Sequence, residues 1–254
     1  MLATRSHYRL LLLHWCLIIF GTAVAIQTPL SASPSNIEGT DGLRLQEIID
    51  RAVPYEKLFV EPGRYRGPVL INKPLTLEST GAAIIDGGGQ GRVVTIDAPN
   101  VTIRGFIIQN SGRRLDIEDS GVFVTPEGHN ATVENNRILN NLIGVYLKGP
   151  TDAKVIANRI EGDRTLRVNE RGNGVQLWRT PGSIVSGNNI SWGRDGIFVT
   201  TSKKNKFSDN HIHNVRFAVH YMYTNESEVS DNLSENNHLG YAIMYARKIR
   251  IVGN

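Results

Sequence analysis

A repeat of 22 residues is the feature that most constrains how this chain can fold. Four short apolar segments begin 22 residues apart, at Gly174, Gly196, Ala218 and Gly240, and an asparagine follows each of them by 14 residues. Extended toward the N-terminus, this asparagine series has steps of 22, 30, 22, 22 and 22 and comprises Asn136, Asn158, Asn188, Asn210, Asn232 and Asn254. The one longer step predicts an insertion of eight residues.

A unit this short holds two or three strands and cannot bury an apolar face alone, whereas stacked units can. Parallel stacking would place like residues about 4.8 Å apart, with Val, Ile and Leu inside. The recurrent asparagines would then form a ladder of amide hydrogen bonds. We therefore predict an all-β fold, a right-handed parallel β-helix with 22-residue coils.

The N-terminal end of such a stack needs a cover, because an open coil exposes unpaired strand edges. Residues 41–52 suit a capping helix, with an apolar stripe made by Leu43, Ile48, Ile49 and Ala52. Two charged stretches, Arg113–Asp119 and Asp163–Arg171, interrupt the repeat at equivalent places. We expect both loops to emerge on one side of the molecule.

The N-terminus has the layout of a secretory signal peptide. Met1–Arg9 is basic, and the apolar run Leu10–Ala25 ends in small residues suited to cleavage. This run is shorter than the roughly 20 apolar residues that span a membrane. We predict a cleaved signal peptide at 1–25 and an exported mature protein; an uncleaved anchor is the alternative.

The remaining chain divides into a linker at 26–40 and a β-helix domain at 41–254. The repeat is interrupted at Asn254 without a capping element. We therefore expect the natural protein to continue with further coils.

Composition excludes several classes of function. Lys and Arg outnumber Asp and Glu by only 28 to 24, which is no basic footprint for a nucleic acid. The single cysteine, Cys16, lies in the predicted signal peptide, which excludes disulfides, cysteine-based metal sites and a thiol nucleophile from the mature chain. Of the 22 asparagines, 20 lie from Asn100 onward, which favours turns over a helical or dinucleotide-binding fold.

Strand alternation identifies the side chains that face outward. In the strands that follow the glycine positions, the outward residues include Tyr146, Trp178, Phe198, His220, Met222 and Met244. A contiguous exposed apolar patch indicates a binding face. The alternative is that a loop, or chain beyond Asn254, covers it.

Three of these residues suit a soft metal ion. His220 and Met222 are two apart on one strand, and Met244 occupies the position of Met222 on the next coil. Thioether and imidazole ligands favour Cu(I). His-x-Met is a weak motif, however, and methionine at an interface often serves only as adaptable packing.

Many exported β-helices bind, cleave or epimerise polysaccharides, which makes a polysaccharide-binding or polysaccharide-modifying protein the alternative function. Glycoside hydrolysis needs two carboxylates held across a groove. In the sequence pattern, the outward-facing strand positions carry no Asp or Glu, and these residues lie mainly in turns or in the two inserts. The pattern therefore favours a protein that is not an enzyme.

The segments Ala218–Asn225, Val229–Asn232 and Gly240–Tyr245 closely resemble the signature of the NosD family. These are periplasmic maturation proteins for the copper centres of nitrous oxide reductase, and the resemblance extends over about residues 55–254. It implies a non-enzymatic periplasmic subunit that acts with an ABC transporter of permease and ATPase. It also implies contact with a membrane-anchored copper chaperone and with apo nitrous oxide reductase.

The resemblance further implies a transient Cu(I) site at the matched positions His220, Met222 and Met244. The aromatic residues around it become candidates for partner binding: Trp178, Phe198, Tyr146, Tyr223 and Tyr245.

Overall fold

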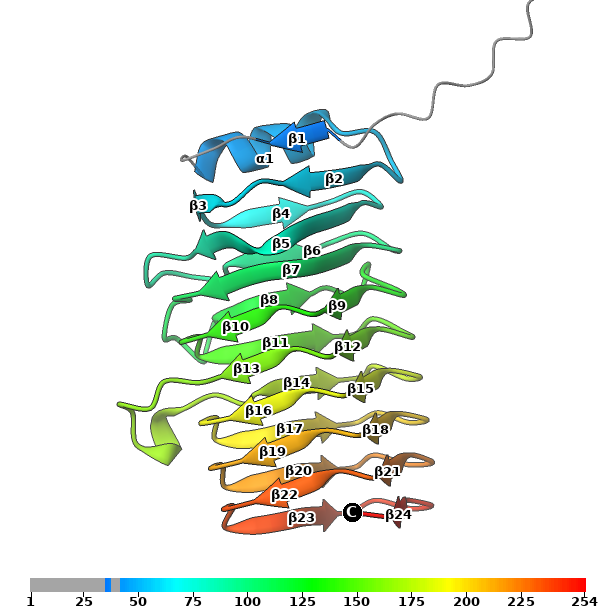
Figure 1. Ribbon diagram of the computed structural model, residues 1–254. Helices are drawn as coiled ribbons and strands as arrows, with labels where there is room; N and C mark the ends of the chain where they lie inside the picture. Colours follow the sequence, from blue (N-terminus) through cyan, green and yellow to red (C-terminus); the bar gives the residue numbers. More distant parts are fainter. Residues whose placement is uncertain (1–34, 38–41) are drawn as a thin grey trace, which may run out of the picture. The chain divides into compact units, whose positions relative to one another are not determined.

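The computed structural model describes residues 35–37 and 42–254, and these form a parallel β-helix (Figure 1). Every strand pair among the described residues is parallel. The predicted fold class is confirmed. The proposed signal peptide lies outside the described residues, and no helix within them is long and apolar enough to cross a membrane.

Each coil contributes strands to three faces. The first face is an eight-stranded sheet of β4 (Val69–Ile71), β6 (Val94–Ile96), β8 (Ser120–Val124), β11 (Ile143–Lys148), β14 (Val175–Trp178), β17 (Asp195–Thr200), β20 (Phe217–Met222) and β23 (Leu239–Met244). The second face comprises β9 (Thr132–Glu134), β12 (Lys154–Ile156), β15 (Ile184–Ser186), β18 (Lys206–Ser208), β21 (Glu228–Ser230) and β24 (Arg250–Val252).

The third face comprises β10 (Arg137–Leu139), β13 (Arg159–Glu161), β16 (Asn189–Ser191), β19 (His211–His213) and β22 (Leu233–Glu235). The second and third faces meet at the N-terminal coils, which contain β1 (Ser35–Ile37), β2 (Lys57–Val60), β3 (Gly63–Arg66), β5 (Thr76–Asp86) and β7 (Thr102–Gln109). Residues 35–37, which we expected in a linker, pair as β1 with β2 instead.

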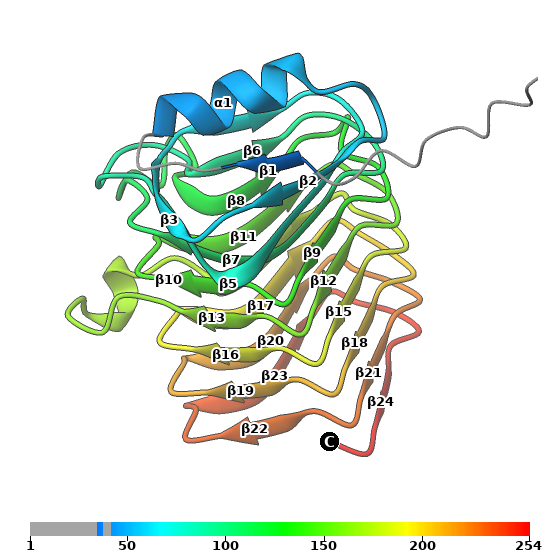
Figure 2. The same cartoon turned by 45° about the horizontal axis from the view of Figure 1, so that its top comes forward.

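The helix α1 (Gly42–Arg51) lies across the N-terminal end of the stack, as expected (Figure 2). Leu45 and Ile49 of this helix are fully buried, Ala52 is nearly so and Ile48 is half-buried. Leu45 was missing from the predicted stripe, and the side chain of Leu43 lies outside the described residues. Gln46 fastens the helix by exchanging two hydrogen bonds with the backbone of Leu70.

The interior is a set of apolar columns, one residue per coil. Val145, Val175, Ile197 and Val219 are in register and completely buried. The glycines of the repeat exist because this packing is tight. A Cβ on Gly196 would lie 2.3 Å from Cγ2 of Ile212. One coil further on, the position of Gly196 is taken by Ala218 and that of Ile212 by the smaller Ser234, so the Cβ has room.

The predicted asparagine ladder is present. Each Nδ2 donates to Oδ1 of the next asparagine over 2.7–3.1 Å, in the series Asn136, Asn158, Asn188, Asn210, Asn232 and Asn254. The same oxygens also accept the backbone N–H of the preceding asparagine. Because all but the last are buried, the ladder fixes the turn between the second and third faces.

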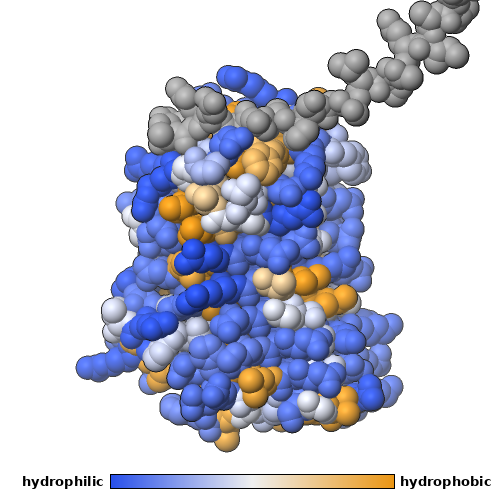
Figure 3. All heavy atoms as spheres, in the orientation of Figure 1, coloured by the Kyte–Doolittle hydropathy of each residue, from blue (hydrophilic) through white to orange (hydrophobic). Residues whose placement is uncertain are grey.

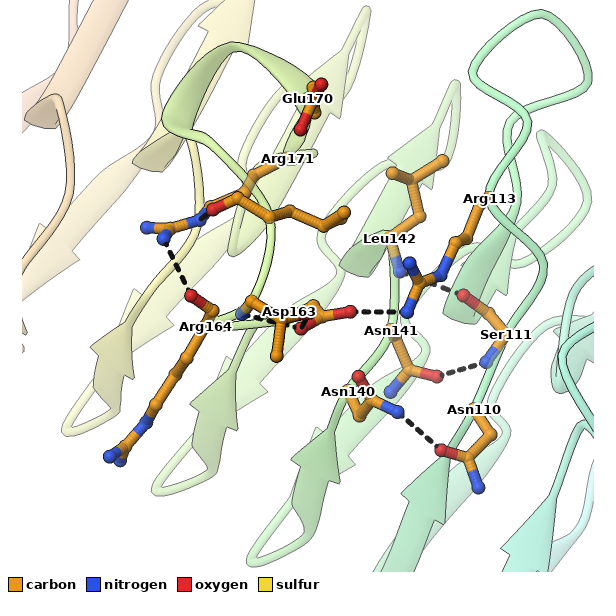
Figure 4. A network of polar contacts seen from close by, with 12 residues as sticks. Asn110, Ser111, Arg113, Asn140, Asn141, Leu142, Asp163, Arg164, Glu170 and Arg171 are labelled. Atoms are coloured by element: carbon orange, nitrogen blue, oxygen red, sulfur yellow. Dashed lines mark hydrogen bonds and ion pairs between the residues drawn. The ribbon is translucent and has the colours of Figure 1, made fainter.

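The two inserts lie on the same side, as expected. Arg113 of the first insert donates to the carboxylate of Asp163, which begins the second (Figure 4). The second insert contains a short 3-10 helix, η1 (Val168–Glu170). The face of the molecule seen in Figure 3 is mostly hydrophilic, with apolar side chains in small separate groups.

Candidate functional site

A pocket of about 240 Å³ lies on the outer side of the first face, where β17 and β20 begin. Asp195 is the first residue of β17, and Phe217 holds the same register position on β20. The side chains that define the pocket chemically are those of Arg194, Asp195, Phe198, Arg216, His220 and Met222.

Asp195 is the anchor of this pocket. Its side chain is nearly inaccessible, and its two oxygens accept hydrogen bonds from Nε and Nη2 of Arg216, both at 2.8 Å. This hydrogen-bonded pair holds the pKa of the Arg216 guanidinium above its usual value. A bidentate pair of this kind fixes the carboxylate in direction as well as in charge.

His220 is held by the same carboxylate. Its Nδ1 lies 2.9 Å from Oδ2 of Asp195. The imidazole ring also contacts Phe198 and Phe217, with ring centroids 4.9 and 5.2 Å away. These contacts leave the ring in a single orientation.

The free nitrogen of His220 follows from this geometry. A carboxylate oxygen only accepts, so Nδ1 carries the proton that it shares with Asp195. In the neutral imidazole Nε2 then presents a lone pair. Nε2 is buried and has no hydrogen-bond partner among the described residues. An oriented, unpartnered imidazole nitrogen backed by a carboxylate is the arrangement that metal-binding histidines use.

Met222 joins His220 in lining the pocket, whereas Met244 lies beside it. Met222 and Met244 are in register on β20 and β23, as predicted. Met222 is half-buried and Met244 is 40% exposed. The structure therefore brings His220 and Met222 to one pocket and places the second thioether on the neighbouring strand at its edge.

Two sequence-based expectations about this pocket were wrong. His220 was expected to be exposed, but only 7% of it is accessible, because the chain entering β17 and β20 builds a wall around it. The outward face was also expected to lack carboxylates, yet Asp195 reaches it. The sequence signal was weak: Asp195 stands where the next coils have Phe217 and Leu239, so a lone acid replaces apolar residues.

The aromatic candidates fall into three groups. Tyr223 and Tyr245 are exposed and stack with ring centroids 5.0 Å apart and planes 8° from parallel. Trp178 and Phe198 are half-buried, and the guanidinium of Arg179 lies 4.5 Å from the Trp178 ring centre.

Tyr146, the third group, was expected to face solvent but is only 4% exposed, and that expectation was wrong. It packs edge-to-face against Phe123, and the guanidinium of Arg92 lies over the Phe123 ring. Glu118 of the first insert binds both Arg92 and Lys148, which draws this loop over the aromatic pair. The sequence left open the alternative that a loop covers the patch. At this end of the sheet, the first insert does cover it.

Among the described residues, no group of three or more His, Cys, Asp and Glu side chains could hold a metal ion. Any metal at this pocket would therefore depend on the methionines. One imidazole nitrogen and two thioethers form a soft donor set that suits Cu(I) and is poorly suited to harder ions.

Comparison with known protein families gives a match in the part of the chain that contains this pocket. Residues 156–254 match the family described as "Periplasmic copper-binding protein (NosD)". This segment belongs to the NosD family. It contains every residue that lines the pocket, Asp195, His220 and Met222 among them, and also Met244 on the neighbouring strand.

Two NosD proteins are similar over a longer stretch. The "Probable ABC transporter binding protein NosD" of Pseudomonas aeruginosa is 34% identical over 180 residues, which cover 71% of this chain and 39% of that protein. The protein of the same name from Stutzerimonas stutzeri is 38% identical over 134 residues, covering 53% of this chain and 31% of that one. The matched part thus spans well under half the length of these relatives.

Solved structures share the architecture. A pectate lyase, Pel9A, superposes with a TM-score of 0.62 at 13% sequence identity, covering 79% of this chain and 63% of the enzyme. At this identity the similarity shows the β-helix fold and nothing of the chemistry.

Proposed function

We propose that this protein is a periplasmic accessory factor that carries Cu(I) for assembly of the copper centres of nitrous oxide reductase, together with an ABC transporter. In this proposal it receives copper from a membrane-anchored chaperone and passes it on to the apo-reductase. Membership of residues 156–254 in a periplasmic copper-binding family supports the metal, and the names of the relatives support the transporter.

The observation that carries the proposal is the free Nε2 of His220. Leaving a buried polar atom without a partner costs about 1–3 kcal/mol, so such an atom needs an explanation. Here Asp195 fixes the tautomer, and Met222 lines the same pocket. A Cu(I) ion bound to Nε2 would satisfy the orphaned nitrogen.

Copper is cargo in this proposal, and the pocket suits a reversible site. His220 supplies a rigid ligand, while Met222 and Met244 supply flexible thioethers that can engage or release the ion. Met244 is 40% exposed, which gives a partner's own ligands a route to the metal. Transfer would proceed by exchange of soft ligands.

A partner would dock next to the methionines. Tyr223 and Tyr245 directly follow Met222 and Met244, and their stacked rings form an exposed aromatic platform. Tyrosine is enriched at protein interfaces because its ring buries apolar area while its hydroxyl stays hydrogen-bonded. Half-buried Trp178 and Phe198 would extend this surface along the sheet.

The test replaces both methionines by leucine, Met222→Leu with Met244→Leu. Leucine nearly conserves volume, so the fold should persist, with circular dichroism and urea unfolding close to those of the parent. We expect Cu(I) affinity, measured by competition with a chromogenic chelator, to fall by about tenfold or more, because two of the three soft ligands are gone. Maturation of the reductase in cells should also fail.

The matched control is Tyr223→Phe with Tyr245→Phe, which changes the residues next to the methionines, keeps the stacked rings and removes no copper ligand. This control should bind Cu(I) as the parent does. Unchanged copper affinity and normal maturation in the double methionine variant would show that the patch only packs or docks.

A further inference from the structure

A second hollow, chemically unlike the copper pocket, lies on the third face beside the second insert. It has a volume of about 410 Å³, within the range of small-ligand sites. We call it the arginine groove, and its charged and hydroxyl side chains are Arg137, Arg159, Glu161, Asp163, Arg164 and Thr165. The proposed copper function uses none of them.

The groove carries more positive charge than its own acids neutralise. Arg137 and Arg159 are in register on β10 and β13, where directly opposed like charges destabilise a sheet. Glu161 is shared, because it binds Arg159 at 3.0 Å and Arg164 at 2.7 Å. Arg137 is exposed and has no ion-pair partner among the described residues.

Asp163 does not offset this charge, because it is committed elsewhere. Its carboxylate accepts from Arg113 of the first insert and from the backbone and hydroxyl of Thr165. Burial alone would raise the pKa of Asp163, but the Thr165 hydrogen bonds and the charge of Arg113 outweigh it and hold the pKa below its usual value. Three arginines thus line the groove, and Glu161 supplies the one carboxylate that pairs with any of them.

The groove is also held open in a fixed shape. Figure 4 shows Arg113 bound to Asp163, which ties the start of the second insert to the first, and Arg171 bonded to the backbone of Arg164, which closes the second insert on itself. The guanidinium groups of Arg164 and Arg171 lie 5.0 and 5.5 Å from the ring centre of Trp192. A wall fastened in this way is preorganised for a ligand.

The strand register sets the spacing of the two arginines. The outward column of Arg137 and Arg159 continues in register through Asn189 and His211, but these two residues contact each other at 3.4 Å, and Nε2 of His211 lies 3.0 Å from Oε2 of Glu235. These positions are about 4.8 Å apart, comparable with one sugar unit of an extended chain. Guanidinium groups bind carboxylates in a bidentate manner, so Arg137 and Arg159 offer two carboxylate sites one coil apart.

From this arrangement we infer that the third face binds an acidic oligosaccharide whose uronate carboxylates sit on Arg137 and Arg159. A ligand that carries one carboxylate on each successive unit matches two arginines about 4.8 Å apart better than a single phosphate does.

The test measures binding of hexagalacturonate to the full chain by isothermal titration calorimetry at low salt. The comparison ligands are a neutral cello-oligosaccharide, inorganic phosphate and hexaglutamate. We expect hexagalacturonate to bind about tenfold more tightly than each of them, or better, and to weaken as salt rises. Equal or tighter binding of phosphate or hexaglutamate would overturn the proposal.

The informative variants are Arg137→Gln and Arg159→Gln, with Arg66→Gln as a control. Arg66 is exposed on β3, away from the groove, so this variant changes the charge equally. Loss of a charge-assisted hydrogen-bond pair should weaken uronate binding roughly tenfold or more for each groove variant. The control should keep the affinity of the parent.

A loss of stability does not confound this test. Arg137 has no ion-pair partner to lose among the described residues, so Arg137→Gln should unfold in urea at the same concentration as the parent or a slightly higher one. Uronate affinity that stays unchanged in a folded Arg137→Gln variant would show that the groove is not the binding site. The methionine variants should bind uronate normally, which separates this inference from the copper proposal.

Discussion

Asp195 decides which nitrogen of His220 is available, although it is not itself a proposed copper ligand. Its position could not be assigned from the sequence, because acidic residues near turns are usually solvated. Asp195 also comes before the strand positions at which alternation predicts an inward or outward side chain. Only the structure shows that the chain entering β17 turns this carboxylate back onto His220 and Arg216. Carboxylates behind a ligating histidine raise its basicity and fix its ring.

We therefore expect Asp195→Asn to lower Cu(I) affinity about ten- to a hundredfold. The amide cannot accept from both Arg216 and His220 through two oxygens, so the tautomer of His220 is no longer fixed. Breaking a buried pair also destabilises, so the chelator competition should be done well below the unfolding temperature. Asp209→Asn, at an exposed turn, is the control and should bind as the parent does. Parent-like affinity in folded Asp195→Asn would rule out this positioning role.

At the scale of elements, the asparagine ladder is what locks one coil onto the next. Oδ1 of Asn188 accepts from both the backbone N–H and Nδ2 of Asn158, and its own Nδ2 donates to Asn210 and to the carbonyl of Val155. Both capacities of the amide are therefore used inside the protein. The period of 22 made this ladder predictable, because a side chain that recurs once per coil must lie above its own copy.

Asn188→Ala should lower the free energy of unfolding, measured in urea, by about 2–5 kcal/mol, because it leaves two buried donors of Asn158 without an acceptor at about 1–3 kcal/mol each. Asn254→Ala removes the equivalent pair of bonds to Asn232, but at an exposed position where water can replace them. This control should cost less than about 1 kcal/mol. Equal losses would mean that burial of the ladder adds nothing.

For the molecule as a whole, the repeat determined the architecture and much of the burial. Val175, Ile197 and Val219 are inside as alternation required. What could not be predicted depends on segments that break the repeat. The inserts have no period, so their coverage of Tyr146 and their arginine clamps were invisible in the sequence. The burial of His220 could not be predicted for a different reason: turn residues such as Arg194 and Arg216 line its pocket, and strand alternation does not say where turn side chains point.

The whole surface also bears on whether the protein is an enzyme, since a β-helix that binds uronates has the architecture of proteins that cleave them. A glycosidase needs a carboxyl group with a raised pKa as the acid and a second, free carboxylate. In the arginine groove Asp163 has a lowered pKa, and Glu161 is bound between Arg159 and Arg164. In the pocket around His220, Asp195 is held by Arg216 and by His220 itself.

We therefore expect hexagalacturonate and oligoalginate to be bound and returned intact. Prolonged incubation with the full chain should release neither reducing ends nor unsaturated uronides, as followed by reducing-sugar assay and ultraviolet absorbance. The reason is that each described carboxylate near the two hollows already neutralises a cation, and a proton donor must instead hold its proton near neutral pH. Turnover that disappears in Glu161→Gln or Asp195→Asn, while Asp209→Asn keeps it, would make the protein an enzyme and contradict its interpretation as a non-enzymatic binding protein.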